Sequence, residues 1–162
     1  MATLYIMCGI PGSGKSTWIK NHITGGILVS RDAIRFNMVK EDEPYFSKEN
    51  DVWKEFVYRI NHYLEIGYNV FADATHINSG ARRKLLKEIK TENVDFQAIY
   101  IDTPVSICLE RNSKRQGREC VPDSAIKRMY SQFEKPSFEE GFSTIYTIDT
   151  LKNKNKIEIR RK

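Results

Sequence analysis

Short apolar runs alternate with amphipathic segments along this chain, and the alternation predicts the fold. Between residues 47 and 67, for example, Val52, Phe56, Ile60 and Leu64 recur at helical spacing. The apolar runs are too short for helices, and they predict strands at Thr3–Cys8, Gly26–Ser30, Asn69–Asp73, Asp95–Ile101 and Thr144–Ile148. Strands that alternate with helices indicate a parallel sheet joined by crossover helices on both of its faces. We therefore expect one α/β domain over residues 1–162.

A glycine-rich loop follows the first predicted strand. It fits the phosphate-binding pattern Gly-x-x-x-x-Gly-Lys-Ser and reads Gly9-Ile10-Pro11-Gly12-Ser13-Gly14-Lys15-Ser16. Its glycines allow successive backbone N–H groups to face phosphate oxygens, and the helix that follows adds partial positive charge. Lys15 can reach the outer phosphates of a nucleotide, and the Ser16 hydroxyl can bind Mg²⁺. A chance match occurs in about one chain in 200 of this length, so we expect ATP and Mg²⁺ as ligands.

The second predicted strand ends in Ser30-Arg31-Asp32, at the edge of the sheet where ligands bind in such folds. If a helix begins here, Asp32 and Arg35 lie three residues apart on one face. A kinase needs a carboxylate to accept the proton of the hydroxyl it phosphorylates, and a nearby cation can fix that acceptor. The alternative is a surface ion pair, which contributes little. The position favours the catalytic interpretation.

The third predicted strand ends in Asp73, followed by Ala74-Thr75-His76. An apolar strand that ends in aspartate beside the phosphate-binding loop is typical of a carboxylate that faces the metal. A helix-capping aspartate is the alternative. We interpret His76 as a loop histidine without a catalytic role, because phosphoryl transfer depends on positioning and electrostatics.

An arginine-rich segment follows the predicted helix that starts at Pro104. If that helix continues, Cys108, Arg111 and Arg115 fall on one stripe, which would be apolar at its start and cationic at its end. Arginines held over a phosphate site stabilise the charge on a transferring phosphoryl group. With Gly117 as a hinge, the segment predicts a short lid. The alternative is a plain basic helix end.

The charge is modest overall but unevenly distributed. The chain has 26 basic and 21 acidic residues, a net charge of +5. Basic residues gather at 111–118 and 152–162, where a polyanion such as nucleic acid could bind. Within the second cluster, Lys156–Arg160 alternates charged residues with isoleucine and predicts an edge strand.

The composition also bears on the compartment. No stretch approaches the roughly 18 apolar residues of a membrane span, and no signal peptide is expected before the first strand. Three cysteines without metal-like spacing argue against a disulfide framework. We expect a cytoplasmic protein without a membrane partner.

Taken together, these elements resemble the kinase domain of the polynucleotide 5′-hydroxyl kinase family, the phage and bacterial end-healing kinases. The resemblance runs from residue 1 to about Phe133. The matching pieces, in the family's order, are Gly9–Trp18, Arg31-Asp32-Ala33-Ile34-Arg35, Asp73-Ala74-Thr75-His76-Ile77-Asn78, and Arg111-Asn112-Ser113-Lys114-Arg115 followed by Val121-Pro122. The family often carries Asp-Thr-Asn where this chain has Asp73-Ala74-Thr75-His76. The Asp-x-Asp-Gly-Thr signature of its phosphatase domain is absent here, so no phosphatase domain is expected.

The resemblance implies a P-loop kinase fold and a role for each matched residue. Asp32 would be the general base, Arg35 would contact the 3′-side phosphate of the acceptor nucleotide, and Asp73 and Thr75 would line the acceptor side. Mg²⁺ would be held by Ser16 with Asp73 nearby. The donor would be bound by the loop and lid: Gly9, Pro11, Gly12, Ser13, Gly14, Lys15, Ser16, Thr17, Arg111 and Arg115. Of these, Lys15 and Arg115 would act on the transferring phosphate.

The sequence thus predicts an ATP- and Mg²⁺-dependent kinase of nucleic acid 5′-hydroxyl ends. Two alternatives remain open. One is a small-molecule or nucleotide kinase on the same fold, because fold alone does not identify the acceptor. The other is a non-catalytic ATP-binding switch module, which would leave Asp32 without a role.

Overall fold

The computed structural model describes residues 1–151 and 156–162. The helices and strands follow the order β1 (Thr3–Cys8), α1 (Lys15–His22), β2 (Ile27–Ser30), α2 (Arg31–Met38), α3 (Glu49–Glu65), β3 (Val70–Asp73), α4 (Ser79–Lys87), β4 (Asp95–Asp102), α5 (Val105–Ser113), α6 (Asp123–Gln132), β5 (Thr144–Asp149) and β6 (Lys156–Arg161). Two short 3-10 helices, η1 (Gly117–Glu119) and η2 (Phe138–Glu140), lie on either side of α6 in the chain.

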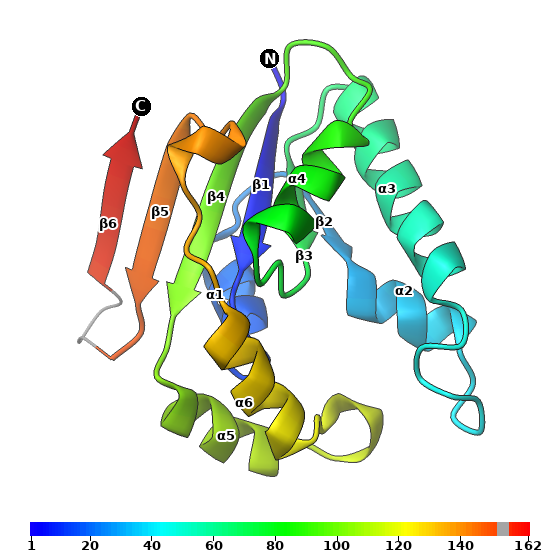
Figure 1. The fold of residues 1–162 in the computed structure, drawn as a ribbon. Coiled ribbons are helices and arrows are strands. Elements are labelled where there is room, and N and C mark those ends of the chain that lie inside the picture. The colour runs from blue at the N-terminus through cyan, green and yellow to red at the C-terminus, as the bar shows by residue number, and fades with distance from the viewer. Residues whose placement is uncertain (152–155) are drawn as a thin grey trace.

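One sheet organises the molecule, in the strand order β2-β3-β1-β4-β5-β6. The first five strands of the chain pair in parallel, and β6 pairs antiparallel with β5 at the edge. All predicted strands are confirmed, including the edge strand. The strand before the glycine-rich loop, β1, lies between β3 and β4 (Figure 1). The loop is therefore at the middle of the sheet's carboxyl edge, where ligands bind in such folds.

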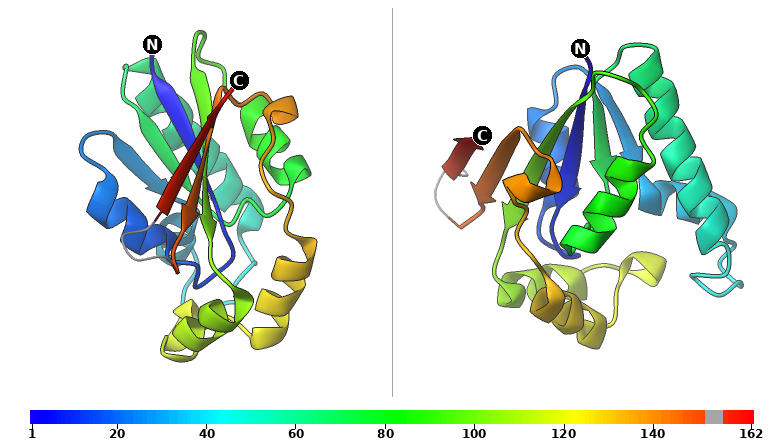
Figure 2. Two further views of the ribbon diagram at one scale, coloured as in Figure 1. Left: turned by 90° about the vertical axis from the view of Figure 1, so that its left-hand side faces the viewer. Right: turned by 45° about the horizontal axis from the view of Figure 1, so that its top comes forward.

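Helices cover both faces of the sheet, as predicted, but unequally (Figures 1 and 2). The larger core joins β1 and β3 to α2, α3 and α4, with Phe56 and Leu85 among its fully buried residues. The smaller core on the other face joins Ile19 of α1 to Met7 and Ile99. Helices α5 and α6 lie beyond the carboxyl ends of the strands. The carboxyl end of β1, where the glycine-rich loop begins, therefore lies between α2 on one side and α5 on the other.

An ion pair lies inside the larger core, between α4 and the segment that leads into β5. Arg82, which is fully buried, donates to the two carboxylate oxygens of Glu140 at 2.6 and 3.3 Å. It also donates to the backbone oxygens of His76 and Glu134, at 2.8 and 2.9 Å. Each charge is thus compensated, which a buried charge requires. No local sequence motif marks this pair, whose partners lie 58 residues apart.

Arg82→Met is expected to lower the free energy of unfolding by about 3–5 kcal/mol, because it leaves the Glu140 carboxylate buried without a cation. Urea denaturation measures the change. Arg83→Met is the matched control, since Arg83 is the exposed neighbour on the same helix and its loss should have little effect. A loss below about 1 kcal/mol for Arg82→Met would contradict this assignment.

Among the described residues, no helix combines the length and the apolar character that crossing a membrane requires. Cys8 and Cys108 are buried and Cys120 is exposed, and all three are free thiols. Of the basic cluster at 152–162, residues 152–155 lie outside the described residues, whereas Arg161 and Lys162 are exposed.

Candidate phosphoryl-transfer site

The glycine-rich loop has the backbone shape that phosphate binding needs. Gly12 and Gly14 have φ values of +81° and +100°, which side chains rarely adopt. A Cβ at Gly12 would lie 2.5 Å from the backbone oxygen of Cys108, and one at Gly14 would lie 3.1 Å from Nη1 of Arg111. No side chain caps the N-terminus of α1, so its first N–H groups face the space where a phosphate would bind.

Lys15 lies over this loop. Its Nζ donates to the backbone oxygens of Gly9 and Ile10 at 2.7 and 3.2 Å. Burial lowers the pKa of Lys15, while the charges of Asp73 and Asp32 act in the opposite direction. The ammonium therefore lies in a desolvated position between the loop and two carboxylates, where a phosphate charge interacts strongly with it.

A cavity of about 440 Å³ opens beside the loop and α1. Its lining residues are Gly12, Gly14, Thr17, Trp18, Asn21, Arg111, Arg115 and Thr150. Arg111 donates from Nη1 to the backbone oxygen of Ser13 at 3.1 Å, which holds α5 against the loop. Both lid arginines thus border the same cavity as the loop, as the sequence predicts for a donor site.

The predicted stripe on α5 is wrong in one respect. The helix ends at Ser113, so Arg115 lies in the following loop and not on a continued helical face. The cause is Asn112, which is 1% exposed and exchanges hydrogen bonds with the backbone of Val121 through Nδ2 and Oδ1, at 2.6 and 3.0 Å. The chain must turn back within these few residues to make both bonds.

The segment after α5, which includes η1, also contacts the carboxyl end of α2. Nη1 of Arg118, in η1, donates to the backbone oxygen of Val39 at 2.5 Å. The guanidinium carbon of Arg118 lies 4.8 Å from the ring centre of Phe36. These contacts satisfy the carboxyl end of α2 and connect it to the lid. Sequence reasoning did not find this contact, which joins residues 79 positions apart.

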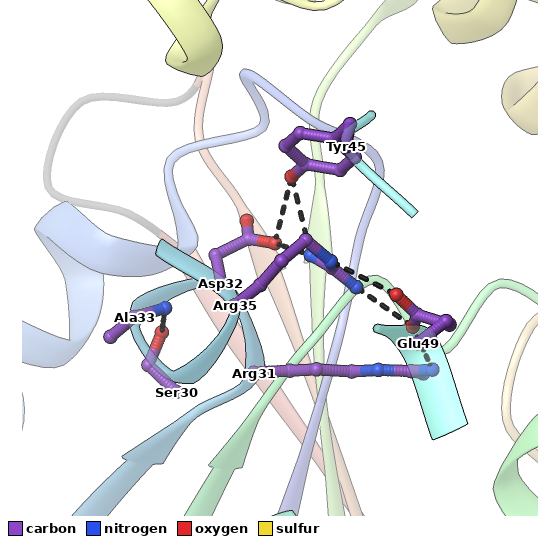
Figure 3. Close-up of polar contacts among 7 residues, drawn as sticks. All are labelled: Ser30, Arg31, Asp32, Ala33, Arg35, Tyr45 and Glu49. Carbon is purple, nitrogen blue, oxygen red and sulfur yellow. Dashed lines mark hydrogen bonds and ion pairs between the residues drawn. The ribbon is translucent and has the colours of Figure 1, made fainter. Parts of the chain in front are cut away.

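Asp32 and Arg35 are brought together on α2, as predicted (Figure 3). Ser30 caps this helix by accepting from the backbone N–H of Ala33 at 3.2 Å, so Asp32 lies in the first turn. Nη1 of Arg35 lies 2.5 Å from Oδ1 of Asp32. The Asp32 side chain is 67% exposed and that of Arg35 only 6%. The pair is therefore more than a surface ion pair, since one partner is held inside the protein.

Two residues that the sequence reasoning missed complete this cluster (Figure 3). Glu49, at the start of α3, accepts from Arg35, and the hydroxyl of Tyr45 lies 3.3 Å from Oδ1 of Asp32 and 3.2 Å from Nη1 of Arg35. Burial and the charge of Asp32 raise the pKa of Tyr45, which keeps its phenol protonated and able to donate. No local motif marks either residue.

Asp73 is the last residue of β3, which lies between β2 and β1, and Thr75 and His76 follow it. Burial raises the pKa of Asp73, and the charge of Lys15 opposes that rise. The backbone oxygen of Thr75 accepts from the N–H of Gly9 at 3.0 Å, which holds this segment against the loop. His76 is buried, and its Nδ1 lies 2.6 Å from the backbone oxygen of Met7. Burial lowers the pKa of His76 to about 4, so it is a neutral packed residue at physiological pH.

The residues present fit a nucleotide with Mg²⁺. Glycine positions that a Cβ would obstruct form a cradle for phosphate. Lys15 lies over the loop, and the lid arginines border the cavity beside it. Ser16, in the first turn of α1, and Asp73 offer the hydroxyl and carboxylate oxygens that Mg²⁺ prefers. Bound there, the ion would neutralise phosphate charge.

Residues 4–136 match a family model described as an AAA domain, AAA_33, and this match covers the sheet's first four strands, the loop and the lid. The chain belongs to this family. The family places it among the P-loop kinases, in agreement with the loop, the strand order and the paired arginines described above.

Two proteins named as kinases and one solved structure are similar to this chain in sequence. The chain is 29% identical over 157 residues to the L-seryl-tRNA(Sec) kinase of Methanococcus maripaludis, a match that covers 91% of this chain and 59% of that protein. It is 26% identical over 145 residues to a protein of Autographa californica nuclear polyhedrosis virus named as a bifunctional polynucleotide kinase/RNA ligase, covering 82% of this chain and 21% of that one. A chain in the structure of the Pnkp1/Rnl/Hen1 RNA repair complex is 27% identical, with a TM-score of 0.70, over 81% of this chain and 43% of that chain.

These relatives confirm the resemblance to polynucleotide kinases and the P-loop kinase fold. The chain spans about three fifths of the archaeal relative and about one fifth of the viral one. These two proteins are named for different acceptors, a seryl-tRNA and a polynucleotide. Their shared feature is kinase chemistry, so this chain is a kinase-family protein.

Proposed function

We propose that this protein transfers the γ-phosphate of ATP to the 5′-hydroxyl end of DNA or RNA. The observation that carries the proposal is the Asp32–Arg35 pair, held beside the phosphate-binding loop in a chain related to polynucleotide kinases. Asp32 would accept the proton of the 5′-hydroxyl as that oxygen attacks the γ-phosphorus.

On the donor side, the loop from Gly9 to Thr17 would bind the ATP phosphates. Lys15 and Arg115 would stabilise the charge of the transferring group. Arg111 lines the same cavity as Arg115. Ser16 and Asp73 would hold Mg²⁺, which would neutralise charge on the donor phosphates.

On the acceptor side, Arg35 would place its charge close to the reacting hydroxyl, because it contacts Asp32. In a nucleic acid, the anion within reach is the 3′-side phosphate of the terminal nucleotide. Asp73 and Thr75 would line the acceptor side as well, since Asp73 ends the neighbouring strand β3 and Thr75 comes two residues later.

A second candidate is transfer to a smaller hydroxyl presented by an RNA, such as the seryl group of an aminoacyl-tRNA. The 29% identity to the archaeal seryl-tRNA kinase over 91% of this chain favours it. The same base and phosphate loop would serve this reaction, but Arg35 would then face no 3′-side phosphate.

A panel of acceptors with ATP labelled in the γ-phosphate separates these candidates. It contains a 5′-hydroxyl DNA oligonucleotide, a 5′-hydroxyl RNA oligonucleotide, a nucleoside 3′-monophosphate, the plain nucleoside, seryl-tRNA and a reaction without acceptor. We expect the oligonucleotides and the 3′-monophosphate to be phosphorylated. The nucleoside should react about 10- to 100-fold more slowly, because it lacks a charge-assisted contact with Arg35.

Equal rates on the nucleoside and its 3′-monophosphate would contradict a polynucleotide acceptor. Labelling of seryl-tRNA alone would establish the second candidate instead.

A further inference from the structure

We infer that Glu49 is a positioning residue of the transfer site: it fixes Arg35, and through Arg35 it orients the Asp32 carboxylate. The inference rests on the proposed function insofar as Asp32 is the base. It applies to any hydroxyl acceptor, because it concerns the base and not the group that the base deprotonates.

The carboxylate of Glu49 binds the guanidinium of Arg35 on the side that faces away from Asp32. Its Oε2 accepts from Nε of Arg35 at 3.0 Å and its Oε1 from Nη2 at 2.9 Å (Figure 3). Two parallel N–H···O bonds of this kind fix the plane of a guanidinium as well as its position. Glu49 also pairs with Nη2 of Arg31. Burial opposes its ionisation, yet the bonds and charges of the two arginines hold the pKa of Glu49 below its usual value.

The remaining face of Arg35 points to Asp32. Nη1 donates to Oδ1 of Asp32 and to the Tyr45 hydroxyl, at 2.5 and 3.2 Å. The guanidinium carbon lies 4.8 Å from the ring centre of Tyr45 and 5.5 Å from that of Phe46. Arg35 is thus enclosed by two carboxylates and two rings, and it has one orientation available.

The exposed fractions of the three side chains indicate that Arg35 orients Asp32, and not the reverse. The Asp32 side chain is 67% exposed and the Glu49 side chain is 30% exposed, whereas that of Arg35 is 6% exposed. An exposed aspartate on a first helical turn has several rotamers, so its orientation comes from the buried arginine that it contacts. Glu49 in turn sets the arginine.

The contacts leave one oxygen of the base for chemistry. Oδ1 of Asp32 accepts from both Arg35 and Tyr45. For Oδ2, no hydrogen-bond donor is recorded within residues 1–151 and 156–162. This arrangement presents Oδ2 to an acceptor hydroxyl. Without the Glu49 carboxylate, the plane of the Arg35 guanidinium would no longer be fixed, and the Asp32 carboxylate that contacts it would lose its orientation.

If Glu49 had a purely structural role, its removal would have a different effect. If it only joined α3 to α2, its loss would lower stability without altering the proton transfer.

The charges that face Asp32 are those of Arg35 in direct contact and of Lys15 and Asp73 across the site, with the Tyr45 phenol protonated. Glu49 adds a negative charge behind Arg35. Removing it leaves the cation less neutralised, which favours the ionised, weaker base at Asp32.

Glu49→Gln is the test, because glutamine keeps the shape and removes the charge. With the acceptor that the panel identifies, we expect kcat to fall about 10- to 100-fold with an unchanged KM for ATP. The acidic limb of the pH–rate profile should move to lower pH. Glu49→Asp, which restores the charge, should return that limb toward its original position.

The matched control is Glu55→Gln, which removes a carboxylate from the same helix where it pairs with Arg59 on the surface. It should change neither kcat nor the pH profile. A Glu49→Gln variant with an unmoved acidic limb, or with a loss confined to the KM for ATP, would overturn the inference.

A second measurement does not depend on the acceptor. The carboxyl carbon of Asp32 can be titrated by NMR in the nucleotide-free protein and in both glutamine variants. The midpoint should fall in Glu49→Gln and stay in place in Glu55→Gln, and an unmoved midpoint in Glu49→Gln overturns the inference. If no compound in the panel is phosphorylated, the proposed function fails while this titration still decides the role of Glu49.

Discussion

Asp32→Asn is expected to reduce phosphoryl transfer by about 10²- to 10⁴-fold while leaving ATP affinity nearly unchanged. The amide keeps the size of the carboxylate but does not accept the proton of an attacking hydroxyl. The donor side should persist, because none of the residues that line the donor cavity comes from α2. Single-turnover transfer and equilibrium binding of ATP measure the two quantities separately.

Asp42→Asn provides the control for this substitution, because Asp42 is an exposed acidic residue in the loop after α2. It should transfer phosphate at the wild-type rate. If Asp32→Asn instead lost ATP affinity and kept its rate of chemistry, Asp32 would belong to the metal side of the site and the assignment of the base would be wrong.

Lys15→Ala is expected to lower the transfer rate by about 10²- to 10³-fold at saturating ATP, because one preorganised charge near the phosphates is lost. The fold should remain intact, since within residues 1–151 and 156–162 the hydrogen bonds of Nζ go to the backbone oxygens of Gly9 and Ile10, which belong to the loop itself. The turnover rate, together with the circular dichroism spectrum of the variant, checks both expectations.

Lys20→Ala is the corresponding control, because Lys20 is an exposed lysine on the same helix. It should retain normal turnover. Retention of more than half of the wild-type turnover by Lys15→Ala would refute the donor site at this loop.

The sequence predicted the features that arise from neighbours along the chain. The loop pattern placed Lys15 and Ser16 at the start of α1, and both lie there. The three-residue spacing of Asp32 and Arg35 predicted their contact, because residues three apart on a helix share a face. The alternation of apolar runs predicted the strands, since a buried parallel strand needs a short, nearly continuous apolar run.

Prediction became less reliable where a distant contact competes with the local pattern. Helical spacing alone places Arg115 on the stripe of Arg111, but the two bonds between Asn112 and Val121 end α5 at Ser113. His76 lies in a loop, as expected, but the packing of β1 against that loop also buries it on the backbone of Met7, which the sequence did not predict. Neither outcome has a signature in the neighbouring residues.

By itself, the sequence determined the class of fold, the phosphate-binding loop and the candidate base, because each depends on residues only a few positions apart. The tertiary structure alone decided what surrounds them. Glu49 meets Arg35 across 14 residues, Arg118 meets Val39 across 79, and Arg82 meets Glu140 across 58. Such partners are chosen by the way helices pack against one another and against the sheet, and a charged side chain carries no local mark of the opposite charge that it will meet.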